Sequence, residues 1–170
     1  LMKQGHEVIM VCGSYLGSDT GLKGPFKYGK RRGFVDGIDV IEFDLNYANK
    51  DNLIKRTKVF ILYAFKGLKL LFSEKYDLIF STSTPLTAGI PGIVSSWVLK
   101  KPFVFEVRDL WPELPKAMGV ISNPFVLALM SFLEWLSYYS ADHIIALSPG
   151  MVEGIKKRGV NENKISLIPN

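Results

Sequence analysis

The sequence predicts an α/β fold with one mainly parallel sheet and helices on both of its faces. Six short runs of apolar, β-branched or aromatic residues recur along the 170-residue chain, and helix-like stretches separate most of them. Repeated alternation of strand and helix is typical of a parallel sheet with right-handed crossovers. The predicted strands are 8–12, 38–43, 77–81, 103–108, 143–148 and 165–169.

Four stretches have the features of helices. Residues 53–72 show helical periodicity. The stretch 85–100 begins after Thr84 as a candidate N-cap, with Pro85 at the first helical position. We expect Pro91 to kink or break this helix.

The other two predicted helices differ in character. Residues 124–140 are apolar nearly all round, which indicates deep burial or contact with a membrane or a partner. Residues 149–158 follow Ser148 and end at Gly159, as a capped helix does.

Residues 13–37 interrupt the alternation. They contain seven glycines, and Asp36 with Gly37 has the sequence of a hairpin turn. A long irregular loop of this kind is either a mobile substrate loop or a plain surface excursion. It also contains the basic cluster Lys27, Lys30, Arg31 and Arg32.

Composition narrows the class of protein. With 48% hydrophobic residues the chain is expected to fold, and its single cysteine, Cys12, excludes an internal disulfide framework and a multi-cysteine metal site. The net charge of +5 favours an anionic partner: a nucleotide sugar, a phospholipid surface or nucleic acid. The apolar window 124–139 is shorter than a membrane span needs. The opening "LMKQGHEV" reads as the end of a helix followed by a strand, so we expect further elements upstream.

Ligands of open α/β sheets bind beyond the carboxyl ends of the strands. His6 and His143 precede strands, which places them at the opposite edge and argues against histidine-based triads and zinc sites. The carboxyl edge collects Asp109, the candidate catalytic residue, and the candidate substrate-binding residues Ser14, Ser81, Thr82, Thr84, Arg108, Trp111, Glu113 and Ser148.

Two of these strand ends place a hydroxyl before a proline at a predicted helix start, in "STSTPL" and "ALSPGM". The unpaired N–H groups of a helix N-terminus favour an anion or a sugar hydroxyl. Simple helix capping explains the same residues equally well.

The segment "VRDLWPELP" carries the central chemistry. It delivers Arg108 and Asp109 to the middle of the cleft, where Asp109 and Glu113 can accept hydrogen bonds from hydroxyls and Trp111 offers a flat face to a sugar ring. The alternative is a structural ion pair of Arg108 with Asp109 or Glu113, with Trp111 in the core.

Residues 52–72 alternate basic and bulky apolar side chains, as in a helix that lies in a lipid headgroup layer. An amphipathic helix packed on the sheet with solvated lysines is the alternative. The candidate membrane-contact residues are Lys55, Arg56, Lys58, Phe65, Lys66 and Lys69.

Several motifs resemble the N-terminal domain of glycosyltransferase family four, the retaining GT-B enzymes, over nearly the whole chain. They include "LMKQGHEVIMVCGS", "YDLIFSTSTPLTAGIPG", "ADHIIALSPGMVEGIKKRGV" and "KISLIPN". "PFVFEVRDLWPELPKAMG" resembles the bacterial subgroup that builds capsular, O-antigen or exopolysaccharide repeat units.

The resemblance implies a Rossmann-like three-layer α/β/α domain, the N-terminal half of a GT-B enzyme without its first strand and glycine-rich loop. Residues 1–170 would form one such domain. In this family the N-terminal half binds the acceptor, and a C-terminal half, absent here, binds the nucleotide-sugar donor. The fragment alone would then be inactive, and neither a cofactor nor a metal would be required.

The resemblance also bears on the site. Many family members have histidine where this chain has Arg108, so Asp109 is the better candidate for contacting the acceptor hydroxyl, which it would orient. Related enzymes act on lipid-linked acceptors, which implies a cytoplasmic protein, peripheral at the inner face of the cell membrane.

Two other classes remain as alternatives. A dehydrogenase-like nucleotide-binding domain lacks support because no G-x-G-x-x-G follows a visible strand. A non-catalytic basic module for nucleic acid lacks a recognisable binding motif.

Overall fold

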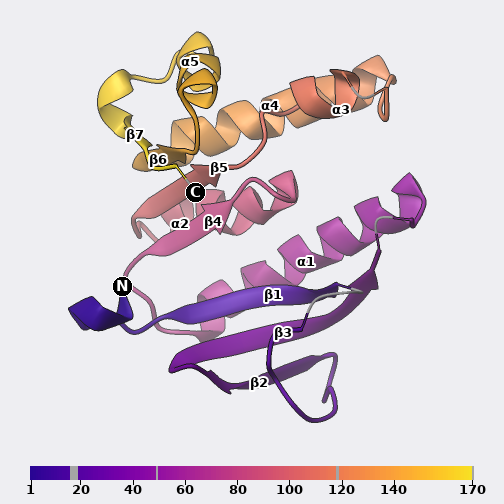
Figure 1. Cartoon of the computed structure of the whole chain (residues 1–170), viewed down its shortest axis with the longest axis vertical. Helices are drawn as coiled ribbons and strands as arrows, with labels where there is room; N and C mark the ends of the chain where they lie inside the picture. The colour runs from indigo at the N-terminus through magenta and orange to yellow at the C-terminus, as the bar shows by residue number, and fades with distance from the viewer. Residues whose placement is uncertain (16–18, 49, 118, 170) are drawn as a thin grey trace. The chain divides into compact units, whose positions relative to one another are not determined.

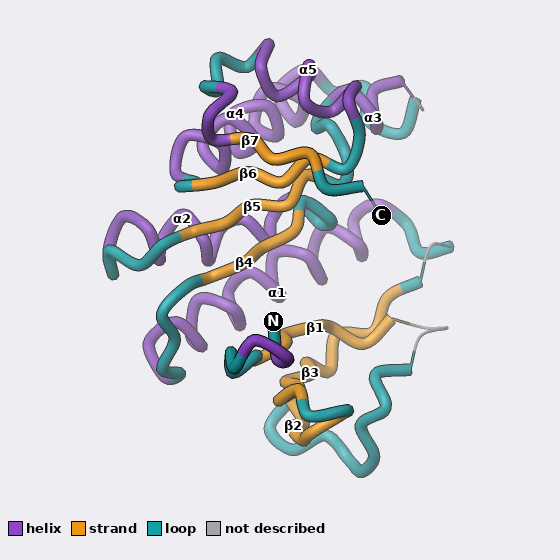
Figure 2. The backbone as a smooth tube through the Cα atoms, turned by 60° about the vertical axis from the view of Figure 1, so that its left-hand side comes forward, coloured by secondary structure: helices purple, strands orange, loops and turns teal. Residues whose placement is uncertain are grey.

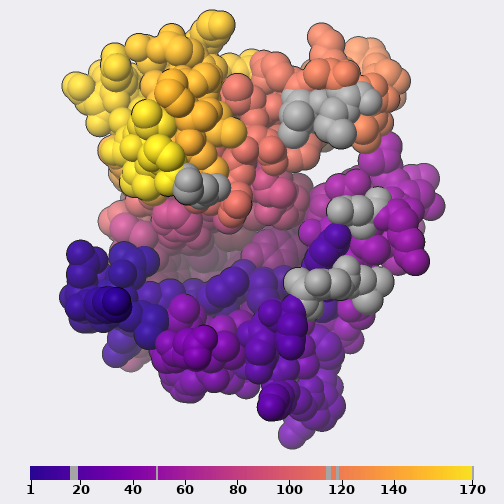
Figure 3. Space-filling view, viewed as in Figure 1, coloured from indigo at the N-terminus to yellow at the C-terminus, as the bar shows by residue number. Residues whose placement is uncertain are grey.

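The computed structural model describes residues 1–15, 19–48, 50–117 and 119–169. The chain divides into two compact units, Leu1–Gly67 and Leu68–Asn170, which can be followed by colour in the ribbon and in the space-filling view (Figure 1, Figure 3). Each unit has its own sheet. The mixed α/β, Rossmann-like fold class predicted from the sequence is confirmed, with two sheets in place of one.

The first unit contains a mixed three-stranded sheet in the order β1-β3-β2. Strand β1 (Ile9–Tyr15) runs parallel to β3 (Ile38–Tyr47), and β2 (Lys30–Val35) runs antiparallel to it. A 3-10 turn, η1 (Met2–Gln4), precedes β1, and helix α1 (Leu53–Ser73) begins in this unit.

Helix α1 is tied to the sheet of the first unit by Tyr63. Its hydroxyl donates to the Val11 carbonyl oxygen at 2.9 Å, and its ring packs edge-on against Phe43. Beside Val11, Cys12 is half-buried, and burial raises the pKa of its thiol to about 11. At neutral pH this thiol is therefore protonated and a poor nucleophile.

The hairpin predicted at Asp36 and Gly37 is present: both residues have positive φ, 50° and 83°, and they join β2 to β3. The expectation that all of 13–37 is irregular was wrong, because 30–35 forms β2. The basic residues of this strand gave it the composition of a loop in the sequence. In the structure two of them pair with carboxylates of β3: Arg31 with Glu42 at 2.8 Å and Arg32 with Asp39 at 2.5 Å.

The second unit contains a four-stranded parallel sheet in the order β4-β5-β6-β7, visible as adjacent strands in Figure 2. The strands are β4 (Ile79–Thr82), β5 (Phe103–Val107), β6 (His143–Ala146) and β7 (Ile165–Leu167). The helices are η2 (Leu86–Ala88), α2 (Gly89–Val98), α3 (Glu113–Ala117), α4 (Pro124–Ser140), α5 (Pro149–Lys157) and η3 (Glu162–Lys164).

Strand β5 is the centre of this unit's core. Phe103, Phe105 and Val107 are fully buried on one face, where Tyr138 of α4 packs against Phe105. Helix α2 comes so close to this face that a Cβ on Gly92 would lie 2.2 Å from the Phe103 ring. Glycine at this position therefore lets the helix backbone approach the strand.

The helix predicted for 85–100 begins later than expected. Pro85 has extended backbone angles (φ −75°, ψ 156°), and Thr84 makes no capping bond, so the N-cap assignment was wrong. Helix α2 starts only at Gly89 and continues through Pro91 to Val98. Pro91 does not break it because it is the third helical residue, where the backbone N–H has no partner within the helix.

Helix α4 begins at Pro124 as predicted, with the side chain of Asn123 accepting from the first amides. Its buried positions include Glu134, Ser137 and Tyr138. Its exposed face carries most of its large apolar side chains, namely Phe125, Val126, Leu129, Phe132, Trp135 and Tyr139. Within the described ranges, no helix combines the length and hydropathy of a membrane span.

Candidate functional site

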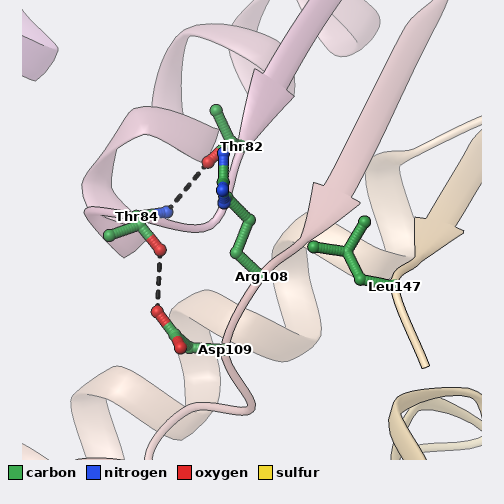
Figure 4. Close-up of a pocket in the computed structure, with 5 residues that line it drawn as sticks. All are labelled: Thr82, Thr84, Arg108, Asp109 and Leu147. Atoms are coloured by element: carbon green, nitrogen blue, oxygen red, sulfur yellow. Dashed lines mark hydrogen bonds between the residues drawn. The ribbon is translucent and has the colours of Figure 1, made fainter. Parts of the chain in front are cut away.

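A pocket of about 470 Å³ lies at the carboxyl edge of the parallel sheet (Figure 4). Strands β4, β5 and β6 pair in parallel, so their carboxyl ends share one edge. Residues at the ends of these strands or just after them line the pocket: Thr82, Thr84, Arg108, Asp109 and Leu147. The structure brings residues of 81–84 and 108–113 together in this pocket, whereas no residue of 148–151, the third segment expected at this edge, is among these lining residues.

Asp109 is held inside this pocket by Thr84. The Thr84 hydroxyl donates to Oδ2 of Asp109 at 2.8 Å, and the Thr84 amide donates to Oγ1 of Thr82 at 3.2 Å. A carboxylate has about four acceptor positions, and one of them is used by Thr84. The pocket therefore presents an oriented carboxylate with acceptor capacity for the hydroxyl of a ligand.

The backbone that carries Arg108 and Asp109 is fixed by a residue that the sequence reasoning did not single out for this role. Ser83 is buried, and its Oγ accepts from the amides of Arg108, at 2.9 Å, and Asp109, at 3.2 Å. The position of Ser83 between two hydroxyl residues in "STST" gave no signal that would separate it from its neighbours.

Trp111 lies half-buried against the core, and its indole N–H donates to the Ser83 carbonyl oxygen at 2.9 Å. Ser83 thus bonds to both ends of the segment 108–111. The use of the Trp111 face as a platform for a sugar ring stays a prediction. The Thr84–Pro85 and Trp111–Pro112 peptide bonds are both cis.

The two backbone polar groups of Trp111 are held by a pair of opposite charges. Its amide donates to Oε1 of Glu134 at 3.0 Å, and its carbonyl oxygen accepts from Nη2 of Arg158 at 3.3 Å. Arg158 and Glu134 lie 2.9 Å apart. Glu134 is the one charged residue in the sequence of α4, a signal that could have pointed to this role.

Burial raises the pKa of Glu134 to about 6, and the Arg158 guanidinium opposes that rise. Tyr138 donates its hydroxyl to the same carboxylate at 3.0 Å. Burial also raises the pKa of the Tyr138 phenol, and the neighbouring Glu134 charge adds to the rise. Tyr138 therefore remains a donor, which keeps the bond to Glu134 intact at neutral pH.

Arg108 is exposed at the mouth of the pocket. Among the described residues, the carboxylate recorded as its ion-pair partner is Glu106, at 3.9 Å. Glu113, the other carboxylate considered as its partner, instead pairs with Arg158 at 3.4 Å. The structural ion pair considered for Arg108 with Asp109 or Glu113 is not recorded in the described part of the chain.

The remaining predicted substrate-binding residues lie outside this pocket lining. Ser81 is buried within β4, and the Ser148 hydroxyl caps α5 by accepting from the Met151 amide at 3.3 Å. Ser14 belongs to the first unit, where its hydroxyl donates to the Phe43 carbonyl oxygen at 3.3 Å and accepts from the Leu45 amide.

The two histidines lie at the amino ends of strands, as expected. His143 is the first residue of β6, with its Nε2 2.9 Å from the Ser166 hydroxyl, and His6 is exposed before β1. No cluster of three or more histidine, cysteine or acidic residues able to hold a metal occurs in the part of the chain that the structure describes.

The basic residues of α1 have varied surroundings. Lys55 pairs with Asp51 at 2.9 Å, and Lys66 donates to the Gly29 carbonyl oxygen at 3.1 Å. The Arg56 guanidinium lies 5.8 Å from the centre of the Phe60 ring. Exposed residues of α1 include Ile54, Lys58, Ile61, Leu62, Phe65 and Lys69.

Comparison with known proteins gives a family and distant structural likenesses. The sequence profile of Glycosyltransferase Family 4 matches residues 1–170. No curated protein matches the chain at a significant level.

Three solved structures are similar over part of their length. Anabaena HepE in complex with UDP is 15% identical, with a TM-score of 0.42 over 74% of this chain and 30% of that one. Its complex with UDP and glucose is 16% identical, with a TM-score of 0.41 over the same shares. The UDP-GlcNAc 2-epimerase from Methanocaldococcus jannaschii is 12% identical, with a TM-score of 0.49 over 97% of this chain and 46% of that one.

The chain thus spans less than half the length of each of these three proteins. Its Rossmann-like fold, the polar pocket at the carboxyl edge of its parallel sheet and a profile match over the whole sequence lead to one assignment: the chain belongs to glycosyltransferase family 4.

Proposed function

We propose that the chain is the acceptor-binding part of a retaining glycosyltransferase. The reaction moves a sugar, of hexosyl type, from a nucleotide-sugar donor to a lipid-linked saccharide acceptor in the synthesis of a bacterial surface polysaccharide. The observation that carries the proposal is the carboxylate of Asp109, oriented by Thr84 in a pocket at the sheet edge where α/β proteins bind ligands.

Asp109 acts on the acceptor in this proposal. Its carboxylate accepts a hydrogen bond from the acceptor hydroxyl and fixes that oxygen for attack on the donor sugar. Donor binding is assigned to a C-terminal half of the whole protein, outside this chain. Retention of anomeric configuration is compatible with Asp109 as an orienting group, because a phosphate oxygen of the donor can take the proton.

Transfer assays on the whole protein test this proposal. With a radiolabelled nucleotide sugar and a membrane lipid extract as acceptor, Asp109→Asn is expected to lower label transfer at least about tenfold. Thr84→Val is expected to lower it less, because the carboxylate remains. Asp77→Asn is the matched control, since its carboxyl group is fully exposed and lies 4.0 Å from its nearest cation, Lys101. Unchanged transfer by Asp109→Asn removes Asp109 from the site.

Contact with the inner face of the cell membrane is a further part of the proposal. Helix α1 exposes Lys58, Phe65 and Lys69 together with aliphatic residues, and α4 exposes an aromatic ladder in which Phe132, Trp135 and Tyr139 stack in succession. Lysines beside apolar residues on α1, and exposed aromatic rings on α4, each suit a lipid headgroup layer.

Vesicle co-sedimentation tests this contact. Binding to vesicles with anionic lipid is expected to weaken with salt and in the double variant Lys58→Glu, Lys69→Glu. Lys157→Glu, an exposed lysine of α5, is the matched control. Equal binding to neutral and anionic vesicles contradicts the proposal.

A thermal-shift screen separates the other classes considered from the sequence. NAD and short duplex DNA are expected to leave the melting temperature of the chain unchanged. A strong shift with NAD indicates a dehydrogenase-like domain, and a strong shift with DNA indicates a nucleic-acid module.

A further inference from the structure

Arg108 differs from Arg31, Arg32 and Arg158 in its electrostatic surroundings. Arg31, Arg32 and Arg158 each have a carboxylate oxygen within hydrogen-bond distance, at 2.8, 2.5 and 2.9 Å. For Arg108 the corresponding separation is 3.9 Å, to Glu106, and about half of its side chain is exposed. The guanidinium of Arg108 is therefore only weakly neutralised within the described residues.

The neighbouring carboxylate does not compensate this charge. Asp109 follows Arg108 directly, yet its carboxylate accepts from the Thr84 hydroxyl at 2.8 Å. Figure 4 shows the two side chains reaching toward different parts of the pocket, Arg108 toward Thr82 and Asp109 toward Thr84. The pocket thus has a positive and a negative pole.

This separation is built into the backbone. Ser83 accepts from the amides of both Arg108 and Asp109, and the Trp111 indole bonds to the Ser83 carbonyl oxygen. Behind them, Glu134 and Arg158 hold the Trp111 peptide groups. Because these hydrogen bonds fix the backbone of 108–111, the side chains of Arg108 and Asp109 are held apart even when no ligand is bound.

We infer that Arg108 binds a phosphate group of the acceptor, so that the pocket takes a phosphorylated sugar. A guanidinium binds phosphate through two parallel N–H···O bonds, whereas the Asp109 carboxylate repels an anion and attracts a hydroxyl. A sugar phosphate presents both groups to the two poles. The pocket volume of about 470 Å³ lies in the range of small-molecule sites. This inference rests on the proposed function and names the chemical class of its acceptor.

The diphosphate of the nucleotide-sugar donor is the other source of the same chemistry, and the test separates the two. Glucose 1-phosphate, glucose and UDP are titrated into the chain at concentrations up to about 10 mM, with binding followed by NMR. We expect glucose 1-phosphate to bind, glucose to bind at least about tenfold more weakly, and Arg108→Gln to remove the difference. Arg108→Lys is expected to keep part of the difference between glucose 1-phosphate and glucose, because an ammonium group attracts phosphate as a point charge but cannot make the two parallel bonds of a guanidinium.

Lys101→Gln is the matched control, because Lys101 precedes β5 at the amino edge of the sheet. Melting temperatures of all variants verify that they are folded. Failure of the wild-type chain to bind glucose 1-phosphate, or binding unaffected by Arg108→Gln, overturns the inference. It is also overturned if Arg108→Gln weakens UDP and leaves glucose 1-phosphate unaffected, since the phosphate is then the donor's. The proposed function fails separately, through unchanged sugar transfer by Asp109→Asn in the whole protein.

Discussion

Glu134 and Arg158, whose Oε2 and Nη2 atoms lie 2.9 Å apart, bind the backbone of the same residue, Trp111. Glu134, from the middle of α4, accepts from the Trp111 amide, and Arg158, at the end of α5, donates to the Trp111 carbonyl oxygen. The pair therefore joins two helices to the segment that carries Arg108 and Asp109. A buried carboxylate is tolerated here because an amide and a phenol donate hydrogen bonds to its Oε1 and the charge of the Arg158 guanidinium lies 2.9 Å from its Oε2.

Glu134→Ala is expected to lower the free energy of unfolding by about 2–4 kcal/mol, because it leaves the Trp111 amide and the Arg158 charge without their partner. Urea denaturation measures this loss. Glu134→Gln, which keeps an oxygen acceptor, is expected to lose less. Glu153→Ala is the control, since its exposed side chain makes one ion pair, with Lys156 at 3.4 Å. Equal stability of Glu134→Ala and wild type contradicts the role of the pair.

The pH dependence of stability provides a second check on Glu134. Because its pKa is raised from 4.5 to about 6, the folded state binds its proton more tightly than the unfolded state does. The corresponding stabilisation is fully present below pH 4.5 and is lost as the pH rises through about 6, a change of about 2 kcal/mol.

Denaturation curves of wild type and Glu134→Gln at several pH values isolate this contribution. The difference in unfolding free energy, wild type minus variant, is expected to fall between pH 4.5 and 7. If this difference instead rises over the interval, the Arg158 charge outweighs burial and lowers the pKa of Glu134.

Ser83→Ala is expected to cost about 1–3 kcal/mol of stability, because the amides of Arg108 and Asp109 lose their acceptor. Sugar transfer by the whole protein should fall as well, since Asp109 loses its fixed position. Hydrogen exchange at the two amides, compared with the exposed-site control Ser122→Ala, measures the local effect. Unchanged exchange rates would show that Ser83 does not fix this backbone.

Gly92→Ala is expected to destabilise the chain by about 3 kcal/mol or more, because its Cβ would lie 2.2 Å from the buried Phe103 ring. Gly150→Ala is the matched helical control, with nothing nearer than 4.0 Å to its Cβ, and should be neutral or slightly stabilising. Thermal melting of both variants tests the close approach of α2 to β5, and similar melting temperatures would refute it.

Local chemistry in the sequence determined many of the elements. The strands 38–43 and 103–108 were visible as β-branched and aromatic runs, and Asp36-Gly37 specified its hairpin through positive φ. The start of α4 at Pro124 was also read from the sequence. These signals lie within a few residues of the structure they specify, so they can be recognised from the sequence alone.

The edge of the sheet that holds the pocket also followed from the sequence, because parallel strands bring their carboxyl ends together whatever their order. Thr82, Thr84, Arg108 and Asp109 were placed there without coordinates, and they line one pocket. The strand β2 was missed because three consecutive basic residues and a glycine gave it the composition of a loop.

Only the tertiary structure decided which polar groups of the second unit form hydrogen bonds with each other. Ser83 meets the amide of Arg108 across 25 residues, and Glu134 meets the amide of Trp111 across 23. Pro85 likewise has extended backbone, where local preference predicted a helix start. Hydrogen bonds between distant segments depend on how helices pack on the sheet, and that packing is a property of the whole chain rather than of any short stretch of it.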